Sequence, residues 1–137
     1  MEFPDCTKIG SHEIEIIPRY NETDKGGIVH NSVYALYWEI GRTEILRVNG
    51  VAYADLENAG IFFVVAELGI KYRRPAFYDE KLRLKVSCDE VTAAKIVHKY
   101  ELYRKSNGEI IAEGFTTIAC VDKNGKIRRI PEFMYPE

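Results

Sequence analysis

The sequence predicts a single α+β domain, residues 1–137, in which one long helix is wrapped by a curved antiparallel sheet of about five to six strands. Three observations support this fold. The length of 137 residues suits one domain with a sizeable core. A helical segment at 31–48 is apolar all round in its first half, so most of its surface needs cover. Strand-like segments follow it in succession, which is typical of antiparallel pairing.

The segment before the helix, residues 12–20, has the period of two that a half-buried strand shows. Ile14, Ile16 and Tyr20 fall on one face, and charged side chains fall on the other. Pro18 cannot donate a backbone hydrogen bond, so it indicates an edge strand or a bulge. The segment is therefore expected to be an edge strand or to contain a bulge.

The helix itself has start and stop signals. Asn31 or Ser32 is the candidate N-cap, and Asn49-Gly50 is the candidate C-terminal stop. Further strands are expected after the helix, at 61–73, 81–88, 95–103 and 110–121, with a short one at 127–130. The dipeptides Asn107-Gly108 and Asn124-Gly125 are typical of the turns between antiparallel strands.

Composition excludes several classes of function. The net charge of -2 gives no general reason to bind nucleic acid or an anionic membrane. No apolar run approaches the roughly 20 residues that a membrane-spanning helix needs. The three cysteines, Cys6, Cys88 and Cys120, are an odd number without metal-ligand spacing, which favours a reducing, cytoplasmic location.

The segment 23–31 is the most informative part of the chain. It places Asp24 in a glycine turn directly before the apolar helix. The N-terminal end of a helix can stabilise a developing oxyanion, and a carboxylate beside it suggests attack on a carbonyl. The alternative is that Asp24 only caps its turn, as Asp often does before Gly.

Asp24, Gly27, Ile28, Val29 and Tyr34 together resemble the signature of the 4-hydroxybenzoyl-CoA thioesterase group of hotdog-fold proteins, particularly its small bacterial acyl-CoA thioesterases. The resemblance continues through Tyr37, Glu39, Arg42, Thr43, Glu44, Tyr72, Arg73, Pro75 and Asp79, and ends near Arg129 and Pro131. It implies a hotdog fold and hydrolysis of an acyl-CoA to a free acid and coenzyme A. It implies no cofactor, because coenzyme A is part of the substrate. It also implies a homodimer, or a tetramer built from dimers, with the active site at the subunit interface.

The resemblance also assigns roles within the site. Asp24 would be the nucleophile or the general base, and the backbone N–H of Asn31 would donate to the oxyanion. Tyr20, His30 and Tyr34 would lie near the acyl group. Close relatives often carry His where this chain has Asn31, so a role as helix cap or interface residue stays open for His30. For Tyr20 the alternative is an aromatic residue of the strand that faces the core.

The phosphates of coenzyme A require a local basic patch. Arg73, Arg74 and Lys95 are the candidates, and the alternative for each is a solvated charge at a strand edge. Glu39 lies on the helix, where another branch of the superfamily has its catalytic glutamate. A structural partner of Arg42, Arg73 or a neighbouring subunit is the other interpretation of Glu39.

The histidines do not indicate a metal. His12, His30 and His98 lie on separate elements without paired-ligand spacing, which argues against zinc. His98 alternates with apolar strand residues and is expected to be a hydrogen-bonded core residue. Two rivals to the enzyme remain at this stage: a non-catalytic module that binds acyl-CoA or an acyl carrier, and an interaction protein on the same fold.

Overall fold

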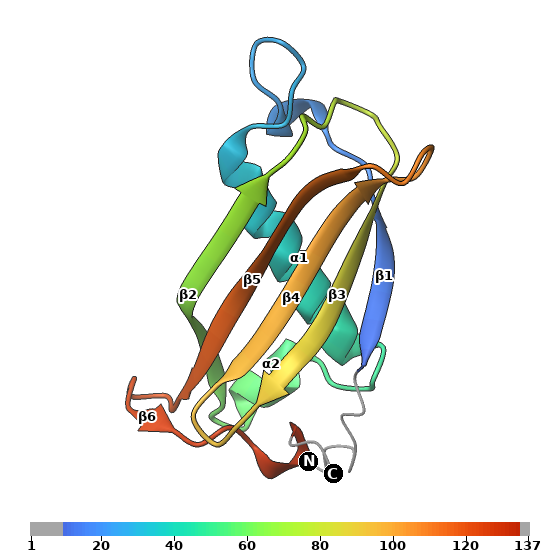
Figure 1. Cartoon of the computed structure of the whole chain (residues 1–137). Helices are drawn as coiled ribbons and strands as arrows, with labels where there is room; N and C mark the ends of the chain where they lie inside the picture. Colours follow the sequence, from blue (N-terminus) through green and yellow to red (C-terminus); the bar gives the residue numbers. More distant parts are fainter. Residues whose placement is uncertain (1–9, 135–137) are drawn as a thin grey trace.

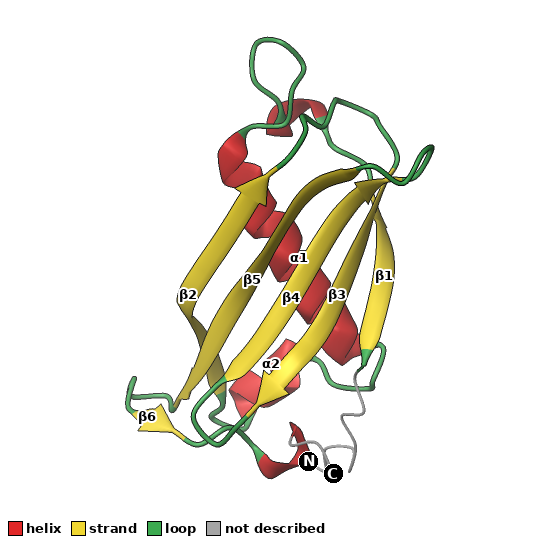
Figure 2. Ribbon diagram, in the orientation of Figure 1, coloured by secondary structure: helices red, strands yellow, loops and turns green. Residues whose placement is uncertain are grey.

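A computed structural model describes residues 10–134 of the chain. Six antiparallel strands form one sheet, and one long helix crosses one of its faces (Figures 1 and 2). The strand order is β1-β3-β4-β5-β2, and β6 pairs with β5. This arrangement confirms the predicted α+β fold with its long helix and five to six strands.

The bounds of most elements lie close to the predicted segments. In chain order they are β1 (Ser11–Ile16), 3-10 turns at Tyr20–Glu22 and Asn31–Val33, α1 (Tyr34–Arg47), α2 (Tyr53–Asn58), β2 (Phe62–Tyr72), β3 (Leu82–Val91), β4 (Ile96–Arg104), β5 (Ile110–Val121), β6 (Ile127–Arg128) and a 3-10 turn at Glu132–Met134. The short helix α2 was not predicted. It buries Leu56 and packs at the end of the sheet where β2 begins (Figure 1).

Strand β1 is shorter than predicted because the chain turns after Pro18. The Arg19 N–H donates to Oε1 of Glu22 at 2.8 Å, and the Glu22 N–H donates to the Arg19 carbonyl at 2.9 Å. These bonds close a 3-10 turn that contains Tyr20. Tyr20 is 77% exposed, so the prediction that it faces the core with Ile16 is wrong.

Helix α1 begins at Tyr34, after a single 3-10 turn. His30 caps that turn, because its Nδ1 accepts a hydrogen bond from the Ser32 N–H at 3.1 Å. The cap therefore lies one residue before the predicted Asn31 or Ser32. At the other end Gly50 has a φ of 85°, a left-handed conformation that suits glycine, and the helix stops where predicted.

The core lies between α1 and the strands beneath it. Trp38 stacks on Tyr100 with ring centroids 4.8 Å apart, and both side chains are buried. Gly41 lets the helix approach the sheet, since a Cβ there would lie only 3.0 Å from Leu84. Buried apolar residues of β3 and β4 complete this contact, as their alternation predicted.

The part of this face formed by β2 is less covered. Leu68 and Tyr72 belong to the row of β2 that pairs with buried residues of β5, yet both are about half exposed. On the helix, Leu36 and Ile40 are also exposed. The expectation that the first half of α1 is buried on most sides is therefore wrong for one copy of the chain. The outer edge of β2 pairs with no other described strand.

Other expectations concern the membrane and the cysteines. None of the helices in the described part is long and apolar enough to cross a membrane. Cys88 and Cys120 form no disulfide, and Cys6 lies outside the described residues.

Candidate active site

Asp24 holds its turn with one carboxylate oxygen. Its Oδ1 accepts hydrogen bonds from the N–H groups of Gly26 at 3.0 Å and Ile28 at 3.3 Å. The backbone closes the same turn, with the Asp24 N–H donating to the Ile28 carbonyl at 2.8 Å and the Gly27 N–H to the Asp24 carbonyl at 3.1 Å. No described residue donates to Oδ2, and the side chain is exposed. Asp24 therefore does cap its turn, as the alternative interpretation expected, but only through Oδ1, and Oδ2 remains free to contact a substrate or water.

A second turn of the same construction lies far from this one along the chain. Oδ1 of Asp122 accepts from the N–H groups of Asn124 at 2.8 Å and Lys126 at 3.0 Å. The Gly125 N–H donates to the Asp122 carbonyl at 2.9 Å, as Gly27 does in the first turn. Because the two turns have the same hydrogen bonds, any difference in reactivity between Asp24 and Asp122 must come from the residues around them.

The segment 76–78 fixes the Asp24 turn from the outside. The Val29 N–H donates to the Ala76 carbonyl, and the Tyr78 N–H donates to the Gly27 carbonyl, both at 2.9 Å. Ile28 also forms an isolated antiparallel bridge with Phe77. The turn is thus attached by backbone bonds to the loop between β2 and β3.

Glu22 joins the turn to the central helix. Its carbonyl accepts from the His30 N–H at 2.9 Å, and its Oε1 accepts from the Tyr37 hydroxyl at 2.9 Å. Burial raises the pKa of Tyr37, and the bond to Glu22 raises it further, so Tyr37 stays a donor. The sequence interpretation missed Glu22. Its position three residues after Arg19, which is the spacing of a capping box, could have indicated it.

The start of the helix supplies an available donor. The N–H of Asn31 donates to no described residue, while its carbonyl accepts from the Tyr72 hydroxyl at 2.9 Å. His30 directs its Nδ1 to the N–H and the hydroxyl of Ser32, the latter at 2.8 Å, so the capping interpretation of His30 is the one seen in the structure. The first turn of α1 carries no acidic side chain that would offset its positive end.

A pocket of about 320 Å³ lies beside this donor. Its lining brings together four of the predicted site residues and several neighbours: Asn31, Tyr34, Arg73 and Arg74, with Ile28, Val29, Tyr72 and Pro75. Tyr34 is buried, and its ring packs edge to face on Tyr72 at 5.2 Å. Tyr20 does not line this pocket; its ring packs on Tyr78 at 5.7 Å, on the far side of the Asp24 turn.

The two arginines of the pocket are already paired. Nη2 of Arg73 lies 2.6 Å from Oε1 of Glu113, and Nε of Arg74 lies 2.6 Å from Oε2 of Glu109. Arg73 lowers the pKa of Glu113 through this contact. All four side chains are partly exposed, so a phosphate could compete for either guanidinium.

Asp24, His30 and Lys95 are, like Tyr20, absent from the lining of this pocket. Asp24 and His30 belong to the segment just before Asn31, whereas Lys95 lies in the hairpin between β3 and β4. That hairpin is at the α2 end of the sheet, opposite the end where α1 begins (Figure 1). The Nζ of Lys95 is 3.9 Å from Oε2 of Glu90.

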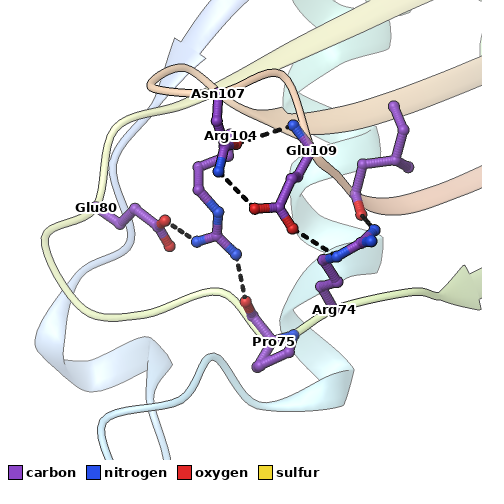
Figure 3. A network of polar contacts seen from close by, with 7 residues as sticks. Arg74, Pro75, Glu80, Arg104, Asn107 and Glu109 are labelled. Atoms are coloured by element: carbon purple, nitrogen blue, oxygen red, sulfur yellow. Dashed lines mark hydrogen bonds and ion pairs between the residues drawn. The ribbon is translucent and has the colours of Figure 1, made fainter.

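A polar network braces the loop that holds the Asp24 turn (Figure 3). Arg104, at the end of β4, pairs with Glu80 and donates to the Pro75 carbonyl at 3.1 Å. Arg74 joins the same network through Glu109. The Arg104 and Glu80 side chains are largely buried, so removal of either one would leave the other charge buried without its partner. The hairpin between β4 and β5 therefore supports the loop through Arg104 and contacts one pocket residue, Arg74, through Glu109.

Two other expectations concern Glu39 and His98. Glu39 forms no ion pair with Arg42 or Arg73 among the described residues, and Arg73 pairs with Glu113 instead. A partner of Glu39 in a neighbouring subunit stays a prediction. His98 is a core residue as predicted, but its buried Nδ1 has no hydrogen-bond partner, and burial lowers its pKa to about 4. In residues 10–134 no cluster of three or more His, Cys, Asp or Glu side chains could hold a metal ion.

The geometry can be compared with known proteins. The family model of the thioesterase-like superfamily matches residues 18–136. The putative acyl-CoA thioesterase YneP of Bacillus subtilis is 32% identical over 84% of this chain and 81% of its own length. The acyl-CoA thioester hydrolase YbgC of Escherichia coli O6:H1 is 27% identical over 86% of this chain and 88% of its own. The structure of a DHNA-CoA thioesterase from Staphylococcus aureus superposes with a TM-score of 0.83 at 32% identity, covering 87% and 80% of the two chains. On the match over nearly its whole length, the chain belongs to the thioesterase-like superfamily.

Proposed function

We propose that this protein hydrolyses an acyl-CoA thioester to a free carboxylic acid and coenzyme A, with Asp24 and the Asn31 N–H as its central groups. One observation carries the proposal: the segment before α1 contains two groups that form no hydrogen bond with a described residue. They are the Oδ2 of Asp24, which can act as the nucleophile or the base, and the Asn31 N–H, which can donate to an oxyanion. The relatives named as acyl-CoA thioesterases support the substrate class. No cofactor is needed for this chemistry, since coenzyme A enters and leaves with the substrate.

Two routes use the same groups. In the first, Oδ2 of Asp24 attacks the thioester carbon, coenzyme A leaves as a thiolate, and water then hydrolyses the mixed anhydride. In the second, Asp24 takes a proton from a water molecule that attacks the carbon, and that proton passes to the leaving thiolate. In both routes the Asn31 N–H donates to the oxygen that becomes negative.

A homodimer completes the site in this proposal. The free edge of β2 can pair with the same edge of a second copy, and this two-fold pairing is antiparallel. It would cover the half-exposed row that includes Leu68 and Tyr72. An uncovered apolar edge strand is otherwise prone to aggregation. Assembly of two such dimers into a tetramer is compatible with this edge contact.

Coenzyme A would be held by charges from both copies. Arg73 and Arg74 line the pocket of one copy. Antiparallel pairing along β2 turns the α2 end of the second copy toward this pocket, and Lys95 of the partner subunit lies at that end. Each contact to phosphate is charge-assisted and should weaken in salt.

The test is thiol release from short, long and aromatic acyl-CoAs by wild type, Asp24→Asn and Asp122→Asn. Asparagine keeps an oxygen that can accept the same turn hydrogen bonds in both variants. We expect Asp24→Asn to lose at least about a hundredfold in rate, roughly 2.7 kcal/mol of barrier, and Asp122→Asn to match wild type. The second variant controls for the loss of a turn-capping charge.

Other outcomes would redirect the proposal. Equal activity of all three proteins would show that Asp24 is not a reacting group. If wild type releases no thiol from any acyl-CoA, a binding module or an interaction protein becomes the better description. A cytoplasmic location stays a prediction from the sequence.

A further inference from the structure

The loop between β2 and β3 holds the Asp24 turn, but little apolar packing holds the loop itself. Of residues 73–80 only Ala76 is buried, and the aromatic side chains of Phe77 and Tyr78 are exposed. A loop with so few buried apolar contacts is expected to open easily. The backbone bonds between this loop and the turn would then open with it, unless polar contacts keep the loop in place.

Glu80 supplies such contacts with both of its carboxylate oxygens. Its Oε1 pairs with Arg104 at the end of β4 (Figure 3). Its Oε2 accepts from the Phe77 N–H at 3.1 Å. Arg104 donates from its other terminal nitrogen to the Pro75 carbonyl at 3.1 Å. These two side chains, which we call the Glu80–Arg104 clamp, therefore attach the segment 75–80 to the hairpin between β4 and β5.

The clamped segment lies directly against the candidate site. The Ala76 carbonyl and the Tyr78 N–H, which bond to the Asp24 turn, each belong to a residue that is adjacent to a clamped one. The charge of Glu80 also reaches the pocket, where it adds to the rise in pKa that burial causes at Tyr34. Movement at the clamp would therefore be transmitted to the turn.

The backbone beside Glu80 shows that the loop is held in one particular shape. Asp79 has a φ of 63°, and between residues 10 and 134 no other residue except glycine has a positive φ. A left-handed conformation is less favourable for Asp than for Gly, so it persists where the surrounding bonds fix it. Here the Asp79 N–H donates to the Pro18 carbonyl at 3.0 Å, and the clamp acts at the next residue.

Resting on the proposed hydrolase function, we infer that Glu80 is a positioning residue, which through its pair with Arg104 fixes the turn that carries Asp24. Glu80 does not line the pocket beside Asn31. Its loss should therefore lower the rate of the chemical step more than the affinity for substrate, because Asp24 must meet the thioester at a fixed distance and angle.

The test variant is Glu80→Gln. Glutamine has nearly the same size and keeps an oxygen that can accept from the Phe77 N–H. Its neutral amide leaves the largely buried Arg104 without a countercharge, so the clamp is weakened.

Glu13→Gln is the matched control. Glu13 also pairs with an arginine, Arg83, at 3.6 Å, and accepts a second hydrogen bond from the Tyr103 hydroxyl at 2.8 Å. Both partners are strand residues outside the loop between β2 and β3. The control therefore removes a paired carboxylate of the same kind without touching the clamp.

The first measurement is amide hydrogen exchange, which does not depend on activity. The N–H groups of Val29 and Tyr78 join the loop to the turn, and in Glu80→Gln they should exchange at least about tenfold faster than in wild type. The amides between β3 and β4 should change by a smaller factor, because they report global stability. Glu13→Gln should leave Val29 and Tyr78 at the wild-type rates.

The second measurement is steady-state thiol release from the acyl-CoA that wild type hydrolyses best. We expect the kcat of Glu80→Gln to fall about tenfold or more, with KM within about threefold of wild type, and Glu13→Gln to match wild type. A merely structural role would lower the midpoint of denaturation and leave the kcat of the folded protein unchanged.

If Glu80→Gln does not fold, Arg104→Lys takes its place in both measurements. It keeps a positive charge beside Glu80 but has a single nitrogen instead of the two that contact Glu80 and Pro75. Unchanged exchange at Val29 and Tyr78, or faster exchange without a fall in kcat, overturns the inference. If wild type itself releases no thiol, the proposed function fails, and hydrogen exchange alone then decides whether Glu80 fixes the turn.

Discussion

The two halves of the sheet face that carries α1 differ in how one chain covers them. Over β1, β3 and β4 the strand residues that point toward the helix are almost all buried, and Leu84 is 0% exposed. Over β2, at the other edge of the sheet, the corresponding row is open, and Leu68 is 48% exposed. Apolar side chains alternate along the strands of both regions. The difference shows that a row of apolar side chains predicts which face of a strand is to be buried. It does not predict whether the same chain or another molecule buries it.

The covered region therefore contributes mainly to the stability of one chain, whereas the open region includes the strand β2, whose Tyr72 lines the pocket beside Asn31. Substitutions that are chemically identical should then have different consequences in the two halves.

The largest expected effect compares Leu84→Ala with Leu68→Ala. Leu84→Ala removes buried methyl groups beneath α1 and should lower the free energy of unfolding by about 3–5 kcal/mol. Leu68→Ala should cost about 1 kcal/mol or less at protein concentrations where the chain is monomeric. Urea denaturation at low concentration measures both. Equal costs would show that one copy covers the two halves to the same extent.

A pH effect of about the same size is expected at His98, in the covered half. Its folded pKa of about 4 lies below the ordinary value of 6.5, mainly because burial penalises the charged form and secondarily because of Arg42. The unfolded chain therefore binds a proton below pH 6.5, while the folded chain resists it until about pH 4. Stability should fall between these values, by a total on the order of 3 kcal/mol.

His98→Leu should remove this dependence and leave a flatter stability curve from pH 6.5 to 4. Denaturation of both proteins at several pH values provides the measurement. The same slope in the variant would assign the pH effect to the carboxylates instead.

A smaller effect concerns assembly in the open half. Leu68→Lys places a charge in the row that the proposed dimer covers, and it should raise the dissociation constant at least about tenfold, or 1.4 kcal/mol. Val48→Lys is the control, because Val48 is similarly exposed but lies at the far end of α1. Analytical ultracentrifugation compares the two. An unchanged dissociation constant for Leu68→Lys would exclude this edge as the interface.

Much of the fold was predictable because local patterns agree with it. The alternation in β3 and β4, the glycine that ends α1 and the turns at Gly108 and Gly125 are all confirmed. Tyr20 was misplaced because its alternation continues past Pro18, whereas the Arg19 and Glu22 bonds turn the chain. The thioesterase-like family was predicted from the Asp24 segment and is confirmed by the match over residues 18–136.

The candidate site was predictable in part. Asp24, Tyr34 and Arg73 belong to the residues that resemble the family. Asn31 was assigned from its position after Asp24, and Arg74 from the charge of coenzyme A. The structure brings four of these five, all but Asp24, around one pocket. The support from the Arg104 network and the role of Glu22 were not predictable. They depend on contacts between segments far apart in the chain, such as Arg104 and Glu80.

The sequence by itself determined the long helix, the strands and the turn at Asp24, because each depends on residues only a few positions apart. The tertiary structure decided that the loop between β2 and β3 holds this turn, through the Val29 and Tyr78 N–H groups. It also decided that the outer edge of β2 pairs with no other described strand and that Leu68 stays about half exposed. These properties depend on contacts between segments far apart in the chain, which local sequence patterns do not specify.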